Sequence, residues 1–169
     1  LTYFLKRPWS IDRFLVWMRE WRRFPPFGLL GAMPFPDDDM QTRMRTIRRT
    51  IRTLANRRAM LILFPERDLH PAPDTLPFER GTVWLPRQMP DVPLLPLAIE
   101  IVQGIHEFPQ AWMATGAYFR CDERDDVKWL EAARTEIEGL LKNLRERRRQ
   151  DPESFRTVLK GRLSANERW

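Results

Sequence analysis

The chain has 169 residues, of which 43% are hydrophobic and 31% charged, so it is long and apolar enough to bury one substantial core. Its net charge of +6 comes almost wholly from arginine, whose planar guanidinium binds phosphates and carboxylates, and this leaves nucleic acid and anionic lipid open as partners. A single cysteine excludes an intramolecular disulfide, two histidines give no spacing for a structural metal, and no stretch approaches the roughly 18 to 20 apolar residues of a membrane-spanning helix.

The first predicted element is an amphipathic helix that begins after Ser10, a good N-cap residue, and ends before Pro25. Its apolar residues recur at helical spacing: Ile11, Phe14, Leu15, Met18 and Trp21. Two interpretations of this stripe stay open. It packs on the core, or its tryptophans and arginines lie at a membrane interface.

The next segment, 27–35, is short, apolar and interrupted by glycines, and it leads through three aspartates into a second predicted helix from Met40 to Leu54. This helix has an arginine face, which is either solvated or binds a partner: Arg45, Arg48, Arg49 and Arg52. The run contains no sequence-specific nucleic-acid motif.

A short apolar run, 59–64, predicts a buried strand that stops at Pro65-Glu66-Arg67-Asp68. Open α/β sheets place ligand-binding groups where such strands end. The following elements are predicted in order: a loop at 70–77, a short helix at 78–89 broken near Pro86, strands at 92–102 and 112–119, and a long helix at 125–149. The predicted inward residues of this long helix are Leu130, Ala133, Ile137, Leu140, Leu141 and Leu144.

Helices that alternate with short, continuously apolar strands indicate an α/β fold with a mostly parallel sheet covered by helices. No repeat and no linker divides the sequence. We therefore expect a single domain over residues 1–169.

Four pieces of the chain together resemble the glycerol-phosphate and lysophosphatidic acid acyltransferase family. Phe27-Gly28 followed by Gly31-Ala32-Met33-Pro34 resembles its second block, and Leu63-Phe64-Pro65-Glu66 resembles its third block, Phe-Pro-Glu-Gly-Thr-Arg. Leu76-Pro77-Phe78-Glu79-Arg80-Gly81 is similar to the Pro-Phe-Lys-Arg-Gly that commonly follows the third block. Val92-Pro93-Leu94-Leu95-Pro96-Leu97-Ala98 resembles the fourth block, Val-Pro-Val-Val-Pro-Val-Ala. The resemblance covers about residues 1–102 and implies a glycerol-phosphate acyltransferase-like fold.

The family's first block, His-x-x-x-x-Asp, has no counterpart here. His70 is followed at that spacing by Thr75, and His106 by Ala111. In the family this histidine is the general base that activates the acceptor hydroxyl for attack on an acyl thioester. We therefore predict no catalytic residue within the chain and expect the histidine upstream of Leu1, so that the fold is incomplete at its amino terminus.

The resemblance implies a substrate-binding role for six residues: Gly31, Pro65, Glu66, Arg67, Arg80 and Gly81. Glu66 either contacts the acceptor or pairs with a neighbouring arginine, and Arg80 either binds phosphate or pairs with Glu66. Two departures change the expected charge: Asp37 stands at the position of the second-block arginine, and Arg67-Asp68-Leu69 replaces Gly-Thr-Arg. Because a carboxylate repels phosphate, these departures weaken the case for lysophosphatidic acid as acceptor.

The implied function is transfer of a fatty acyl group from acyl-CoA or acyl carrier protein to a lipid hydroxyl, at the cytoplasmic face of a membrane and with no metal or other cofactor. The expected partners are the lipid acceptor, the acyl thioester and the membrane surface. Two alternatives stay open: a catalytically inactive lipid-binding relative and an arginine-rich nucleic-acid binder. His70 is expected in a surface loop, and Cys121 has no neighbouring histidine to activate a thiol.

Overall fold

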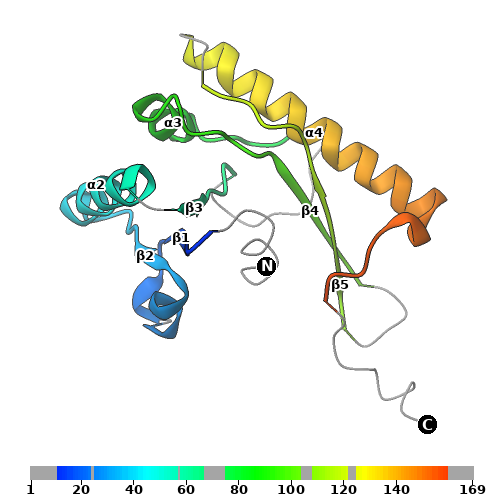
Figure 1. The fold of residues 1–169 in the computed structure, drawn as a ribbon, viewed down its shortest axis with the longest axis horizontal. Coiled ribbons are helices and arrows are strands. Elements are labelled where there is room, and N and C mark those ends of the chain that lie inside the picture. The colour runs from blue at the N-terminus through cyan, green and yellow to red at the C-terminus, as the bar shows by residue number, and fades with distance from the viewer. Residues whose placement is uncertain are drawn as a thin grey trace. The chain divides into compact units, whose positions relative to one another are not determined.

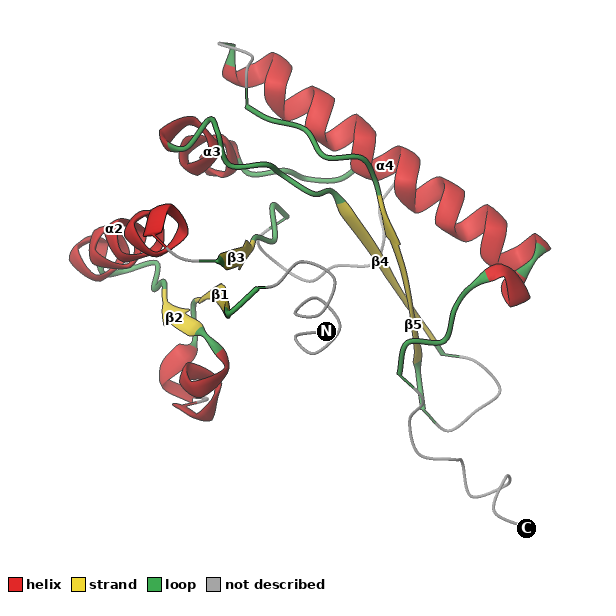
Figure 2. Ribbon diagram, viewed as in Figure 1, coloured by secondary structure: helices red, strands yellow, loops and turns green. Residues whose placement is uncertain are grey.

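The computed structural model describes residues 11–23, 25–56, 58–66, 75–103, 108–121 and 125–159 (Figure 1). The chain divides into two compact units, Leu1–Phe64 and Pro65–Trp169, and each is described by itself. The described residues combine helices with a parallel sheet and an antiparallel strand pair, in agreement with the predicted α/β class (Figure 2). The expected single domain stays a prediction.

The first unit contains a three-stranded parallel sheet in the order β2-β1-β3. Its strands are β1 (Arg13–Met18), β2 (Ala32–Pro34) and β3 (Ala59–Ile62). β1 lies in the centre, with Val16 opposite Ala32 and Phe14 opposite Met60. β3 confirms the strand predicted at 59–64, but it ends at Ile62 and its residues are half-buried rather than buried. The parallel sheet is confirmed in this part of the chain.

The amphipathic helix predicted after Ser10 was wrong, because residues 13–18 form β1, which is followed by two short 3-10 helices, η1 (Trp21–Arg23) and η2 (Pro25–Leu30). Phe14 and Leu15, two of the apolar residues at helical spacing, also begin a continuous apolar run, Phe14-Leu15-Val16-Trp17. A continuous apolar run suits a central strand buried on both faces of a parallel sheet. Phe14 and Leu15 are accordingly buried.

Helix α2 (Met40–Asn56) confirms the helix predicted from Met40 to Leu54. The buried residues are Thr46 and Thr50, whereas Met40 is 64% exposed. Thr46 donates a hydrogen bond to the carbonyl of Pro34 at 2.6 Å, and Thr50 accepts one from Nε1 of Trp17 at 3.0 Å. The helix is therefore attached to the sheet by directional polar contacts.

The second unit has two antiparallel strands, β4 (Leu97–Val102) and β5 (Gln110–Thr115), with Ile99 opposite Met113. The mostly parallel sheet predicted for the whole chain was therefore wrong here. Both strands are also shorter than the predicted 92–102 and 112–119. Pro93 and Pro96 lack the backbone N–H that a sheet ladder needs, and before β4 the backbone makes one isolated bridge, Leu94 to Phe119.

The short helix predicted at 78–89 forms as the 3-10 helix η3 (Arg80–Val83), which continues into α3 (Trp84–Gln88). Pro86 lies inside α3 and does not break it. Because Pro86 is in the first turn of that helix, its missing N–H costs no intrahelical hydrogen bond.

The long helix α4 (Asp126–Gln150) confirms the prediction for 125–149 and is followed by the 3-10 helix η4 (Pro152–Ser154). Asp125 caps it by accepting hydrogen bonds from Val127 and Lys128. Of the predicted inward residues, Ala133 and Leu144 are buried, and Trp129 was missed. The apolar core around this helix consists of Val83, Cys121, Trp129 and Ala133, with Phe78, Leu94, Phe119 and Leu130 packed against it.

Candidate functional site

The segment Pro65-Glu66 is held against the start of η3. The backbone N–H of Glu79 donates a hydrogen bond to the carbonyl of Pro65 at 2.9 Å. This contact joins Pro65-Glu66 to the start of η3, where Arg80 and Gly81 lie. Four of the six predicted site residues are thus brought into one local structure.

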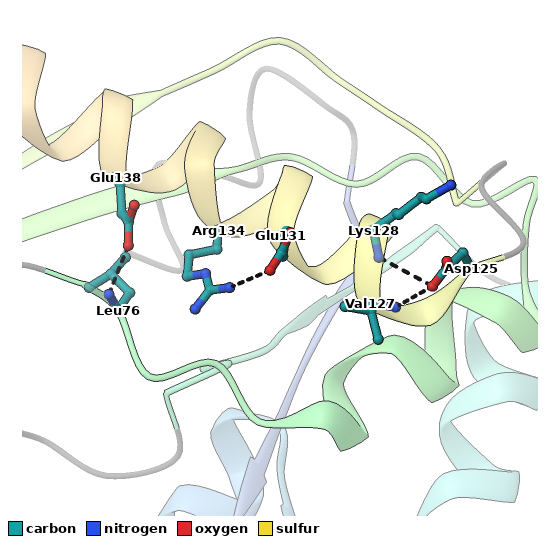
Figure 3. A network of polar contacts seen from close by, with 7 residues as sticks. All are labelled: Leu76, Asp125, Val127, Lys128, Glu131, Arg134 and Glu138. Carbon is teal, nitrogen blue, oxygen red and sulfur yellow. Dashed lines mark hydrogen bonds and ion pairs between the residues drawn. The ribbon is translucent and has the colours of Figure 1, made fainter.

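A second contact holds the other end of the same segment. The backbone N–H of Leu76 donates to Oε1 of Glu138 on α4 at 2.8 Å (Figure 3). Leu76 is itself buried, at 4% exposure. The 76–81 segment is therefore fixed at Leu76 by a carboxylate of α4 and at Glu79 by the Pro65 carbonyl.

Sequence reasoning missed Glu138, because nothing in a long helix with many charged residues distinguishes one carboxylate from another. Figure 3 shows the contrast with Glu131, one of its neighbours on α4, which pairs within the helix with Arg134 at 3.6 Å. The side chain of Glu131 is 63% exposed. Glu138 differs from Glu131 in its partner, because the tertiary structure places the backbone N–H of Leu76 beside it.

The predicted binding residues of the second unit differ in exposure. Glu66 is half-buried, whereas Arg80 and Gly81 are exposed. A Cβ at Gly81 would meet nothing within 4 Å, so packing does not require glycine there. The guanidinium of Arg80 is accessible to an anionic ligand, which the predicted phosphate-binding role requires.

Gly31 belongs to the first unit and has a structural reason for being glycine. Its φ is +100°, and a Cβ would lie 1.9 Å from the carbonyl oxygen of Phe14. Its own carbonyl accepts a hydrogen bond from Val16 at 3.1 Å, at the β1–β2 pairing. The close approach of two backbones therefore explains why this position is glycine. The structure does not test its predicted substrate-binding role.

The remaining candidates give less support for chemistry. Arg67, His70 and His106 lie outside the described residues. Cys121 is buried at 7% exposure in the apolar core beside Val83 and Trp129, so it is inaccessible as a thiol nucleophile. In the part of the chain that the structure describes, no three His, Cys, Asp or Glu side chains form a group that could hold a metal ion.

Asp37 is paired with a cation in the first unit. Its carboxylate lies 3.6 Å from the guanidinium of Arg19, and both side chains are about half exposed. The negative charge that the sequence places here is thus partly offset by a neighbour.

Comparison with known proteins found no family model, no curated protein and no solved structure that matches this chain. Of the helices that the structure describes, none has the length and apolar character needed to cross a bilayer.

Proposed function

We propose that this chain is the substrate-binding part of an O-acyltransferase of the glycerolipid type. It would move a fatty acyl group from acyl-CoA or acyl carrier protein to a lipid hydroxyl at the cytoplasmic surface of a membrane. The observation that supports this most directly is the hydrogen bond from Glu79 to Pro65. It joins the two stretches that resemble the family's third block and the segment after it.

In the proposed reaction a histidine supplied from outside residues 1–169 takes the proton of the acceptor hydroxyl. The hydroxyl oxygen attacks the thioester carbonyl, the C–S bond breaks, and the sulfur leaves as a thiol after taking up a proton. Glu66 would accept a hydrogen bond from another polar group of the acceptor. Arg80 would bind an anionic group of the acceptor or donor.

A catalytically inactive lipid-binding relative is the second candidate. It is favoured by the replacement of Gly-Thr-Arg by Arg67-Asp68-Leu69 and by the Asp37–Arg19 ion pair at a position where the family carries a free cation. Both changes alter the charges that would hold a phosphate. In this alternative the segments would bind lipid without transferring an acyl group.

Thioester turnover tests the proposal. A thiol-reactive dye would report CoA released from palmitoyl-CoA in the presence of a panel of lysolipids, for this chain and for the same chain extended upstream along its reading frame. We expect release only from the extended chain. Release from neither would reject the enzyme in favour of the inactive relative.

Glu66→Gln in the active extended chain tests the site itself. It removes one charge from a half-buried position, and we expect kcat/KM to fall about tenfold to a hundredfold, the range for a lost charge-assisted hydrogen bond. Glu131→Gln is the matched control, because it removes the same charge from an exposed position on α4. An equal fall for both variants would show that Glu66 has no special role.

A further inference from the structure

The outward face of α2 carries a dense positive charge that the proposed acyl transfer does not use. Arg45, Arg48, Arg49 and Arg52 are all exposed and line an open hollow of about 640 Å³. These residues follow one another within about two helical turns, a length of roughly 10 Å. No ion pair joins any of the four to a carboxylate among the residues that the structure describes.

The rest of α2 shows that this charge is concentrated on one face. The helix contains no acidic residue, and its fifth arginine, Arg43, lies over the ring of Phe35 at 4.9 Å. The carboxylate before the helix, Asp39, is engaged at the helix start, where it accepts hydrogen bonds from the backbone and hydroxyl of Thr42. Arg48, Arg49 and Arg52 are therefore available to an external anion, and Arg45 is exposed as well, although its charge also acts on the Asp39 carboxylate.

Methionine lies in the same hollow as the arginines. Met40 and Met44 line it, and Met40 is 64% exposed. An exposed flexible thioether beside guanidinium groups suits the boundary between lipid headgroups and acyl chains. Single-stranded nucleic acid is commonly bound by stacking of its bases on aromatic side chains, and α2 contains none.

We propose that the outward face of α2 docks on a bilayer that carries anionic phospholipid. The guanidinium groups of Arg45, Arg48, Arg49 and Arg52 bind lipid phosphates, and Met40 contacts the headgroup boundary. This docking proposal refines the membrane contact of the proposed function. It rests on that function only for the choice of a lipid surface as the partner. Because the contact is between exposed charges, it should weaken as the salt concentration rises and strengthen as the fraction of anionic lipid rises.

Vesicle flotation with the full chain tests this. Vesicles of phosphatidylcholine mixed with phosphatidylglycerol are compared with vesicles of phosphatidylcholine alone, at low and high salt. We expect binding to the anionic vesicles only, and its loss at high salt. Replacing all four arginines by glutamine should weaken binding by roughly two to three orders of magnitude, at about fivefold for each cation.

The matched control removes four exposed cations from the second unit: Lys128→Gln, Lys142→Gln, Arg149→Gln and Arg156→Gln. It has the same net charge as the α2 variant and should keep most of the binding. Replacing the four α2 arginines by lysine conserves the charge, so this variant should also float with anionic vesicles. Its binding shows that loss in the glutamine variant comes from charge rather than from misfolding.

Three results would overturn the proposal: equal loss in the control variant, equal binding of the unaltered chain to neutral vesicles, or tighter binding to an oligonucleotide than to anionic vesicles. Flotation requires no turnover. Its outcome is therefore independent of whether the chain takes part in acyl transfer.

Discussion

The interiors of the two compact units are chemically different. In the first unit, α2 faces the sheet with two threonines, and Thr50 is fully buried between the indole of Trp17 and the Thr46 carbonyl. In the second unit, α4 buries Trp129, Ala133 and Leu144 against other apolar groups. The first interior combines buried apolar residues of the sheet with directional hydrogen bonds from α2, whereas the second depends on apolar area and packing.

This difference determines which substitutions each unit tolerates. A polar interior loses stability when a donor or acceptor is left unsatisfied, even if the volume is unchanged. An apolar interior loses stability when volume is removed. The following substitutions test the contrast, beginning with the largest expected effect.

Gly31→Ala should destabilise the first unit by about 3 kcal/mol or more, because alanine is strained at positive φ and its Cβ would displace β1 at Phe14. Hydrogen exchange of β1 peptides, followed by mass spectrometry, measures the change. Gly28→Ala is the control, since a Cβ there meets nothing within 4 Å. Equal protection of β1 in both variants would contradict the close approach.

Leu144→Ala should destabilise the second unit by about 2 to 5 kcal/mol, since Leu144 is 1% exposed and its removal leaves a cavity. Exchange of α4 and β5 peptides should accelerate, and urea denaturation gives the free energy. Val127 on the same helix is 57% exposed, so Val127→Ala should change the free energy of unfolding little. A small effect of Leu144→Ala would mean that this interior is not closely packed.

Thr50→Val should destabilise the first unit by about 1 to 3 kcal/mol although the side chain keeps its size, because Nε1 of Trp17 loses its acceptor. Thr53→Val on the same helix should stay within about 0.5 kcal/mol, since its hydroxyl bonds the carbonyl of Arg49 at an exposed position. Stability is again measured by urea denaturation. No difference between the two variants would contradict a polar attachment of α2 to the sheet.

The smallest effect is expected at the start of α2. Hydrogen bonding by the side chain of Thr42, and then by its backbone N–H, lowers the pKa of Asp39 below its ordinary value of 3.8. The charged carboxylate is thus favoured in the folded state, so its stabilising effect is present above that value and is lost as pH falls through the lowered pKa. Asp39→Ala should lower stability at pH 7 and make no difference in strong acid.

Thermal unfolding followed by circular dichroism measures this difference across the pH range. Asp38→Ala is the control, because it removes the same charge from the same loop but not from the cap. If the melting temperatures of Asp39→Ala and the unaltered chain differ by the same amount at every pH, the stabilisation by the cap does not depend on the charge of Asp39.

Part of the candidate site was predictable from the order of residues along the chain. The stop of an apolar run at Pro65-Glu66 indicated a strand end with polar groups, and β3 ends just before it. The role of Glu138 was not predictable. Its contact with Leu76 joins residues 62 positions apart, and no local pattern encodes such a separation.

Local signals in the sequence determined α2 and α4, because a helix closes its hydrogen bonds within a few residues and Asp39 and Asp125 cap the starts. The sequence also determined the arginine charge and the absence of a His-x-x-x-x-Asp pair from these 169 residues. Only the tertiary structure decided that residues 13–18 form a strand, that β4 and β5 run antiparallel, and that Thr46 and Thr50 are the buried residues of α2. Strand pairing and burial depend on segments that are distant in the chain. The same apolar residues are therefore compatible with a helix or a strand, and the segments that pack against them decide between the two.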